Sequence, residues 1–466
     1  MSNLPNGRLP SSFRDPAGFV FRRDGVIYRQ INQVYAPHQA HLVQSGLYAA
    51  LMAEGLLLPT VPAPDVPPAE PATAYQIVQP EPLPFISYPY EWCFGQLQAA
   101  ALATLRLQRL ALAHDMWLKD AAAYNIQWRE NRPILIDTLS FEKIADPAIP
   151  GPWPAYQQFC RHFLAPLALM AWRDVRLSQL LRVYLDGIPL DLASHLLPWR
   201  TRLNWSWLAH IHLHAAAQQR YAGQPAPTSR YPMRRHQLIG LLDSLERAVR
   251  RLRWRAPHGG WADYYHETNY SEAALARKEA LVGEYRDLIR PNSVWDLGAN
   301  TGRFSRLAAE RHIFTVAFDL DPGAVEAHYR AAIAAGQSHV LPLWLDLTNP
   351  SPALGWAQRE RDGWRERGPA GLLLALALAH HLAIGHNLPL DHIAHLFSQL
   401  SPWLIIEFVP KQDSQAQRLL ATRPDIFPDY TRAHFEAAFG VFYVIRRCDS
   451  LPDSLRQLYL MERRPC

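Results

Sequence analysis

From residue 293 onward, short apolar runs alternate with segments of helical periodicity. The apolar runs are SVWDLG, FTVAFDLD, HVLPLWLD, GLLLALAL and WLIIEFV. Such alternation is typical of a parallel sheet with helices on both faces. Two further runs, GVFYVIRRC and RQLYLMERR, are joined only by DSLPDSL. We therefore predict an α/β fold: a Rossmann-like, seven-stranded sheet that closes with a C-terminal antiparallel hairpin.

The N-terminal half follows a different pattern. Strand-like runs flank Asp24-Gly25, a strong two-residue turn signal, so residues 19–31 are predicted to form a hairpin. A second hairpin is expected over 124–137, and the ten prolines in 59–89 exclude a long helix there. Helical patterns cover 37–55, 94–118 and 155–220. This half is predicted to be an α+β domain.

A proline-rich stretch separates the two halves. Residues 221–236 read YAGQPAPTSRYPMRRH, which is the best linker in the chain. A basic helix is expected to follow, over roughly 237–254. We therefore predict an accessory domain over 1–220 and a second domain over 237–466.

Composition narrows the classes of partner. With 49% hydrophobic and 19% charged residues, the chain has the balance of an ordinary globular protein. The net charge is only +5, and 43 of the 47 basic residues are arginine, with no long block of like charge. A nucleic-acid partner stays open but is not favoured.

Cysteines and apolar runs bear on the compartment. No two of the four cysteines form a CxxC pair, which does not support a zinc ribbon or a thioredoxin-type site. The longest apolar run, 372–384, is short for a membrane span and contains two histidines. We expect a cytoplasmic protein with no membrane partner.

The first predicted strand of the C-terminal half leads into a glycine-containing turn. VWDLGANTGRFS places Asp296 at the strand end and Gly298, Asn300 and Gly302 in the turn before a helix. Glycines there let a ligand approach the backbone closely. A carboxylate at Asp296 suits a ligand that carries an ammonium group and would repel a pyrophosphate.

Two more acids end the next two strands. Asp319 lies 23 residues after Asp296, where a carboxylate can accept from both hydroxyls of a ribose. Asp346 follows the third strand, where it can accept from an adenine amine. Asp346 could also simply cap the segment that follows it.

These residues together resemble the first motifs of the class I S-adenosylmethionine-dependent methyltransferases, over about 260–466. Asn300 stands where that family's motif has its middle glycine. The resemblance implies S-adenosylmethionine as the cofactor, held by Asp296, Gly298, Asn300, Gly302, Asp319 and Asp346. The stretch LIIEFVPKQDSQAQRLL and the later FPDYTRAHFEAAF also resemble nodulation-related methyltransferases.

Candidate catalytic groups follow the fourth and fifth strands. His380 and His381 come after the fourth strand and Glu407 ends the fifth, so all three should lie at the ligand edge of the sheet. A histidine can take the proton of an oxygen or nitrogen acceptor. One histidine could instead pack against the cofactor or cap a helix.

A polar-aromatic stretch before the first strand is a candidate lid. It contains Tyr264, Tyr265 and Tyr270, and such a segment can fold over a cofactor and exclude water. The alternative is a helix packed on the sheet edge. No spacing of histidines and acids indicates a metal site.

The N-terminal half contains a second motif. Asp120 precedes Asn125 by five residues, and Asp137 ends the next hairpin. This arrangement resembles the catalytic and metal-binding loops of the protein-kinase-like fold. No lysine precedes Lys119, so only an arginine such as Arg29 could replace the phosphate-binding lysine of that fold. The resemblance therefore implies a degenerate, kinase-like module.

The leading interpretation is an S-adenosylmethionine-dependent methyltransferase with an accessory domain that aids substrate binding. The alternatives are a non-catalytic, cofactor-binding regulatory or scaffold protein, and a bifunctional kinase-methyltransferase. The acceptor stays open among small molecules, saccharides, peptides and RNA. The oligomeric state is also left open.

Overall fold

The computed structural model describes residues 6–220, 233–256, 270–421 and 424–465. The chain folds into two compact units. The first contains Met1–Trp254 together with Ala353–Arg361, and the second contains Arg255–Pro352 and Asp362–Cys466.

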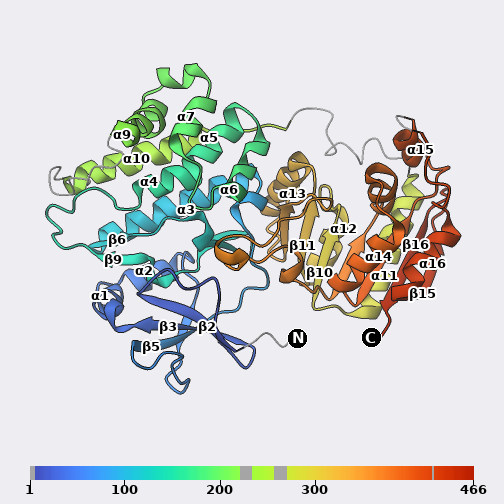
Figure 1. Ribbon diagram of the computed structural model, residues 1–466, viewed down its shortest axis with the longest axis horizontal. Helices are drawn as coiled ribbons and strands as arrows, with labels where there is room; N and C mark the ends of the chain where they lie inside the picture. The colour runs from blue at the N-terminus through green and yellow to red at the C-terminus, as the bar shows by residue number, and fades with distance from the viewer. Residues whose placement is uncertain (1–5, 221–232, 257–269, 422–423, 466) are drawn as a thin grey trace. The chain divides into compact units, whose positions relative to one another are not determined.

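The second unit is built on a seven-stranded sheet with helices packed on it (Figure 1). Its strands, in spatial order, are β12 (Val340–Trp344), β11 (Phe314–Asp319), β10 (Ser293–Leu297), β13 (Leu372–Ala375), β14 (Trp403–Phe408), β16 (Gln457–Arg463) and β15 (Tyr443–Ser450). The first five are parallel, whereas β16 runs antiparallel to both of its neighbours. The predicted sheet and its closing hairpin are confirmed.

The sheet order reverses between two consecutive steps of the chain. From β10 the chain moves outward through β11 to β12, then returns to place β13 on the other side of β10. Ligands in doubly wound sheets bind at such a reversal, outside the carboxyl ends of the strands. We therefore expect a ligand site at the carboxyl ends of β10, β11, β12 and β13.

Helices cover the sheet of the second unit. They are α11 (Glu272–Ile289), α12 (Arg303–Ala309), α13 (Pro322–Ala334), α14 (Leu390–Leu400), α15 (Ser414–Leu420) and α16 (Arg432–Phe442). Helix α11 begins where the Ser271 hydroxyl accepts from the amide of Ala274 at 3.1 Å. Its apolar side contributes Leu281, Val282 and Tyr285 to a core shared with Leu374 and Ile405 of the sheet.

The first unit has an antiparallel sheet and a helical part. The sheet order is β1 (Gly7–Arg8), β2 (Gly18–Arg23), β3 (Val26–Asn32), β5 (Ala74–Pro80) and β4 (Thr60–Pro62). Strands β2 and β3 form the predicted hairpin, and both turn residues, Asp24 and Gly25, have positive φ. The second predicted hairpin is formed by β7 (Ile126–Arg129) and β8 (Arg132–Leu135).

Two predicted helices of this unit are interrupted. The helix expected over 37–55 is two helices, α1 (Ala36–Gln44) and α2 (Leu47–Ala53), because Gly46 takes a left-handed conformation between them. The helix expected over 94–118 ends earlier: α3 spans Phe94–Ala113, and Met116–Leu118 forms strand β6, paired with β9 (Phe141–Lys143).

The first unit extends past the predicted linker. Helix α10 (Arg235–Arg251), which the sequence assigns to the second domain, packs on α3, and the Gln98 side-chain amide donates to the carbonyl of Val249 at 2.8 Å. Residues 221–232 of the predicted linker lie outside the described residues. The boundary between the units falls at Trp254 rather than before α10.

The segment Ala353–Arg361 joins the first unit by specific contacts. The buried carboxylate of Glu360 forms a two-pronged ion pair with Arg14, at 2.6 and 3.0 Å. The Arg361 guanidinium lies 4.5 Å from the centre of the Tyr124 ring. These contacts explain why a short piece of the crossover between β12 and β13 belongs to the first unit.

Within the described part of the chain, no helix combines the length and the apolar character needed to cross a membrane.

Candidate functional site

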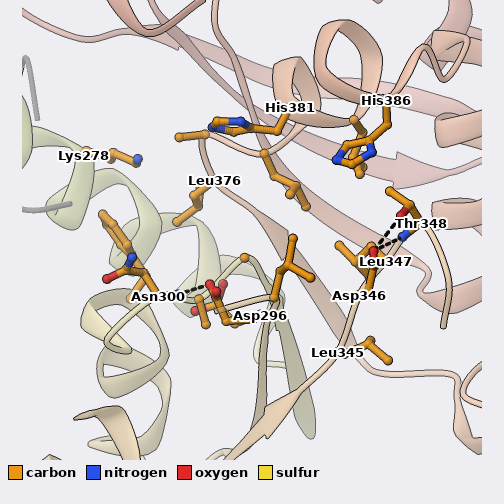
Figure 2. A pocket seen from close by; sticks show the side chains of 18 of the residues that line it. Lys278, Asp296, Asn300, Leu345, Asp346, Leu347, Thr348, Leu376, His381 and His386 are labelled. Carbon is orange, nitrogen blue, oxygen red and sulfur yellow. Dashed lines mark hydrogen bonds between the residues drawn. The ribbon is translucent and has the colours of Figure 1, made fainter. Parts of the chain in front are cut away.

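A cavity of about 200 Å³ opens at the carboxyl ends of β10, β11, β12 and β13 (Figure 2). Its wall includes all three predicted strand-end acids, Asp296, Asp319 and Asp346, together with Lys278 and His381. In this view Lys278 and Asp346 lie at opposite sides, with Asp296 between them. The predicted acids thus share one pocket.

The turn after β10 brings backbone close to this cavity. Gly298, Asn300 and Gly302 all have positive φ, which glycine and asparagine adopt at low cost. A Cβ at Gly302 would lie 2.0 Å from Nε2 of the buried His328. The position therefore excludes any side chain, whereas the left-handed Asn300 explains why asparagine can replace a glycine in this turn.

Asp296 and Asp319 are the two carboxylates nearest the turn. Asp296 accepts from the Ser305 hydroxyl at 2.6 Å, and Asp319 accepts from the backbone amides of Asn300 and Asp321 at 2.7 and 2.8 Å. Burial raises the pKa of Asp296 to about 6, and the charge of Asp319 adds to this rise. Burial likewise raises the pKa of Asp319 to about 6. Burial therefore disfavours the charged form of both acids, and the charge of Lys278 only partly offsets this at Asp296.

Asp346 both caps a turn and lines the pocket. Its Oδ1 accepts from the amide and the hydroxyl of Thr348, at 2.8 and 2.6 Å. Within the described residues, Oδ2 has no hydrogen-bond partner in the protein. The capping role considered from the sequence is present, and one oxygen remains available to a ligand.

Sequence reasoning missed Lys278, which lies on α11 and is 2% exposed. Its ammonium donates to a Glu407 oxygen at 2.7 Å and to the Tyr270 hydroxyl at 3.0 Å. Burial lowers the pKa of Lys278, although the Glu407 carboxylate opposes this. Its rarity was a usable signal, because Lys278 is one of four lysines in an arginine-rich chain.

Glu407 lies behind the pocket wall, in a buried network of charged and polar side chains. It is fully buried, does not line the cavity, and accepts from Lys278 and Tyr270. Burial opposes its ionisation, but Lys278 and Arg456 bring its pKa below the ordinary value. Arg456 in turn forms a two-pronged ion pair with Asp413, at 2.7 and 2.9 Å. The arrangement suits a carboxylate that holds Lys278 in place, not one that meets an acceptor.

The phenol of Tyr270 is part of the same network. Its oxygen donates to Glu407 and accepts from Lys278 and from Arg456, the latter at 2.5 Å. Arg456 also lies 4.3 Å from the centre of the ring. Tyr270, just before α11, is therefore bonded to the charged side chains beside the pocket. The other candidate lid residues, Tyr264 and Tyr265, lie outside the described residues.

The two adjacent histidines differ in position. His381 lines the cavity, and burial lowers its pKa to about 4. His380 is fully buried and does not line the cavity, and among the described residues neither of its ring nitrogens has a hydrogen-bond partner. Burial and the neighbouring His381 hold its pKa well below the ordinary value. Of the pair, His381 alone can meet a molecule in the cavity.

The residues of the predicted kinase-like motif contact other side chains of the first unit. Asp137 forms an ion pair with Arg29 and accepts from the Ser140 hydroxyl at 2.6 Å. Asp120 accepts from the side-chain amide of Gln158 at 2.7 Å, and burial raises its pKa. The Asn125 amide lies 3.5 Å from the same Ser140 hydroxyl. Arg29 thus occupies the metal-ligand candidate Asp137. Over the described residues of the whole chain, no group of histidine, cysteine and acidic side chains could hold a metal ion.

The second unit is a mixed α/β domain. Its seven-stranded sheet carries an acidic pocket at the switch point. No family model matches the chain. The nodulation protein NoeA of Rhizobium meliloti (strain 1021) is 34% identical over 476 residues, which cover 98% of this chain and 96% of NoeA. The chain therefore belongs to the family of the nodulation protein NoeA.

Solved structures resemble less than half of the chain, at low scores. They include the PH0226 protein from Pyrococcus horikoshii OT3, with 14% identity over 43% of this chain and 99% of that one, at a TM-score of 0.32. Magnesium protoporphyrin IX methyltransferase from Synechocystis PCC 6803 with bound SAH is 16% identical over 44% of this chain and 95% of that one, at a TM-score of 0.29. The bifunctional kinase-methyltransferase WbdD is 17% identical over 45% of this chain and 43% of that one, at a TM-score of 0.28.

Proposed function

We propose that this protein is an S-adenosylmethionine-dependent methyltransferase that modifies an oxygen or nitrogen acceptor. The observation that carries the proposal is the pocket, in which Asp296, Asp319 and Asp346, at the carboxyl ends of three adjacent strands, line one cavity together with Lys278. The ligand would need hydroxyls and amines for the acids and a carboxylate for the lysine.

The residues present fit that cofactor group by group. Asp319 would accept from the ribose hydroxyls, and the free Oδ2 of Asp346 from the adenine amine. Asp296 would face the ammonium of the amino-acid end, and Lys278 its carboxylate. Two carboxyls with raised pKa beside one buried ammonium are poised to gain from a ligand of this zwitterionic kind.

The protein's own part in the reaction is binding, alignment and proton handling. When bound, the cofactor would supply a methyl group to an aligned nucleophile, with the methyl–sulfur bond breaking and the sulfur leaving as a neutral thioether. His381 would take the acceptor's proton, because it is neutral at pH 7 and lines the cavity. Glu407 and Tyr270 would act through Lys278 by fixing its position.

The first unit is proposed to aid acceptor binding as a degenerate kinase-like module. The Arg29–Asp137 ion pair supports a module without phosphate transfer, because it occupies a carboxylate that a metal would need. A bifunctional kinase-methyltransferase would require that pair to open. Calorimetry of ATP with magnesium distinguishes the two, since we expect weak binding or none.

Two experiments test the proposed function. Calorimetry with S-adenosylhomocysteine measures binding to the pocket, with 5′-methylthioadenosine as the matched ligand that lacks the amino-acid end. Incubation with methyl-labelled cofactor and fractionated cell extract then identifies what becomes labelled. Tight binding without any labelled product would favour the scaffold alternative, and no binding of either nucleoside would contradict the proposal.

A further inference from the structure

The segment 199–205 of the first unit exposes an unusual amount of apolar surface. Trp199, Leu203 and Trp205 are 74%, 76% and 73% exposed. Large apolar side chains exposed together on a folded protein indicate an interaction site more often than chance. The tryptophans have no ring contact with other described aromatic residues, so the local fold gains little from them.

The backbone of this segment is held from inside. Residues Trp199–Leu203 form a short 3₁₀ turn in which Thr201 alone points inward, at 2% exposure. The Thr201 hydroxyl donates to the Pro198 carbonyl at 2.7 Å and lies 2.8 Å from Nε2 of the buried His212. His212 Nδ1 is in turn 2.7 Å from the Ser194 hydroxyl. The other four residues of the turn are exposed, so the buried Thr201 side chain anchors a backbone that presents them to solvent.

Positive charge accompanies the apolar side chains. Arg200 and Arg202 are both exposed on the same turn, and the Arg200 guanidinium lies 5.2 Å from the centre of the Trp172 ring. The sequence has no aspartate or glutamate from residue 192 to residue 242, although it has six arginines there. The surface is therefore apolar and cationic, with no acid of its own segment to neutralise it.

We propose that the 199–205 surface docks the protein on an anionic phospholipid bilayer. Tryptophan favours the interface of a bilayer, where the ring meets apolar chains and the indole N–H finds an acceptor. Arginines beside it are attracted to lipid phosphates.

Peripheral docking of this kind needs no membrane-spanning helix. The expectation of no membrane partner rested on the shortness of the apolar run 372–384, which bears only on spanning. The 199–205 surface belongs to the first unit and the pocket residues belong to the second, so the proposal does not depend on methyltransferase activity.

Sedimentation with vesicles tests the proposal on the full chain. Vesicles of phosphatidylcholine alone are compared with vesicles that also contain phosphatidylglycerol. We expect the protein to bind the anionic vesicles more tightly. Exchange of both arginines in Arg200→Gln/Arg202→Gln should weaken that binding on the order of 10- to 30-fold, and added salt should narrow the difference.

The apolar contribution needs its own variant and control. Trp199→Ala/Trp205→Ala should reduce vesicle binding roughly tenfold or more, at high salt as well as low. Trp356→Ala is the matched control, since Trp356 is 74% exposed elsewhere on the first unit and should leave binding unchanged. Each variant is checked for an unchanged melting temperature, so that a loss of binding is not a loss of folding.

Three results would overturn the proposal. Equal binding to neutral and anionic vesicles by wild type and variants would assign binding to another surface. Absence of binding to any vesicle would remove the bilayer as the partner. Self-association of the wild type in light scattering, lost in Trp199→Ala/Trp205→Ala and unaffected by vesicles, would assign the surface to a second copy of the chain.

Discussion

The ammonium of Lys278 lies 2.7 Å from a carboxylate oxygen of Glu407, and both side chains are withdrawn from solvent. Lys278 reaches the cavity, whereas Glu407 stays behind it. The pair therefore links the wall of the pocket to the charges of Arg456 and Asp413 in the interior. A buried pair of this kind is costly to break on one side only.

Removal of either partner of that pair should destabilise the second unit. Lys278→Met leaves the Glu407 carboxylate short of a donor, and we expect a loss of about 3–5 kcal/mol in the free energy of unfolding. The double variant Lys278→Met/Glu407→Gln should lose less than the sum of the two single changes, because neither charge is then stranded. Denaturant unfolding of all four proteins measures this coupling. Additive losses would show that the two side chains act independently.

The raised pKa values of Asp296 and Asp319 predict opposite pH trends for folding and for binding. Both carboxyls titrate near pH 6 in the folded protein, against 3.8 for an ordinary aspartate. The folded state thus holds their protons more tightly, so their contribution to stability falls as the pH rises through this window. Affinity for the cofactor should rise over the same window, because the charged Asp296 carboxylate attracts the ammonium group and the charged Asp319 carboxylate accepts from both ribose hydroxyls.

Melting temperature and calorimetric affinity, each measured between about pH 5 and pH 8, test the two trends. Asp296→Asn should flatten part of both curves, since an amide does not titrate. Asp391→Asn serves as a control, because Asp391 lies outside the pocket lining. An affinity that is independent of pH in the wild type would contradict the assigned roles of the two acids.

The adjacent histidines should separate in kinetic tests. His381→Asn should lower kcat about 100-fold or more with cofactor affinity nearly unchanged, if His381 takes the proton. His380→Leu should leave kcat nearly unchanged and stability equal or higher, because it removes two buried ring nitrogens that find no partner in the described part of the chain. Since the pKa of His381 is about 4, no histidine step should appear in the rate near neutral pH. Equal losses in both variants would point to a packing role for the pair.

The sequence predicted the second sheet well because its strands are fully buried. Runs such as SVWDLG and WLIIEFV have no polar face, and acids that follow buried strands must gather at one edge. Asp296, Asp319 and Asp346 could therefore be brought to one pocket without a structure. Glu407 was assigned to the same edge by the same reasoning, but the structure turns it toward Lys278 and Arg456.

The features that the sequence did not predict depend on contacts between distant segments. Lys278 lies in the interior of an ordinary helical pattern. Only the fold shows that it pairs with Glu407, 129 residues further along the chain. Helix α10 is an amphipathic helix that could cover either domain, and its apolar side meets α3. The transfer of Ala353–Arg361 to the first unit rests on Arg14, which no local pattern connects with Glu360.

The pocket at the switch point is proposed to bind S-adenosylmethionine through Asp319. Calorimetry with S-adenosylhomocysteine, on the wild type and on Asp319→Ala, tests it most directly. The variant loses hydrogen bonds to two ribose hydroxyls, so we expect its affinity to fall about 10- to 100-fold. Unchanged affinity in a variant that still folds, or no binding by the wild type, would contradict a cofactor role for this pocket.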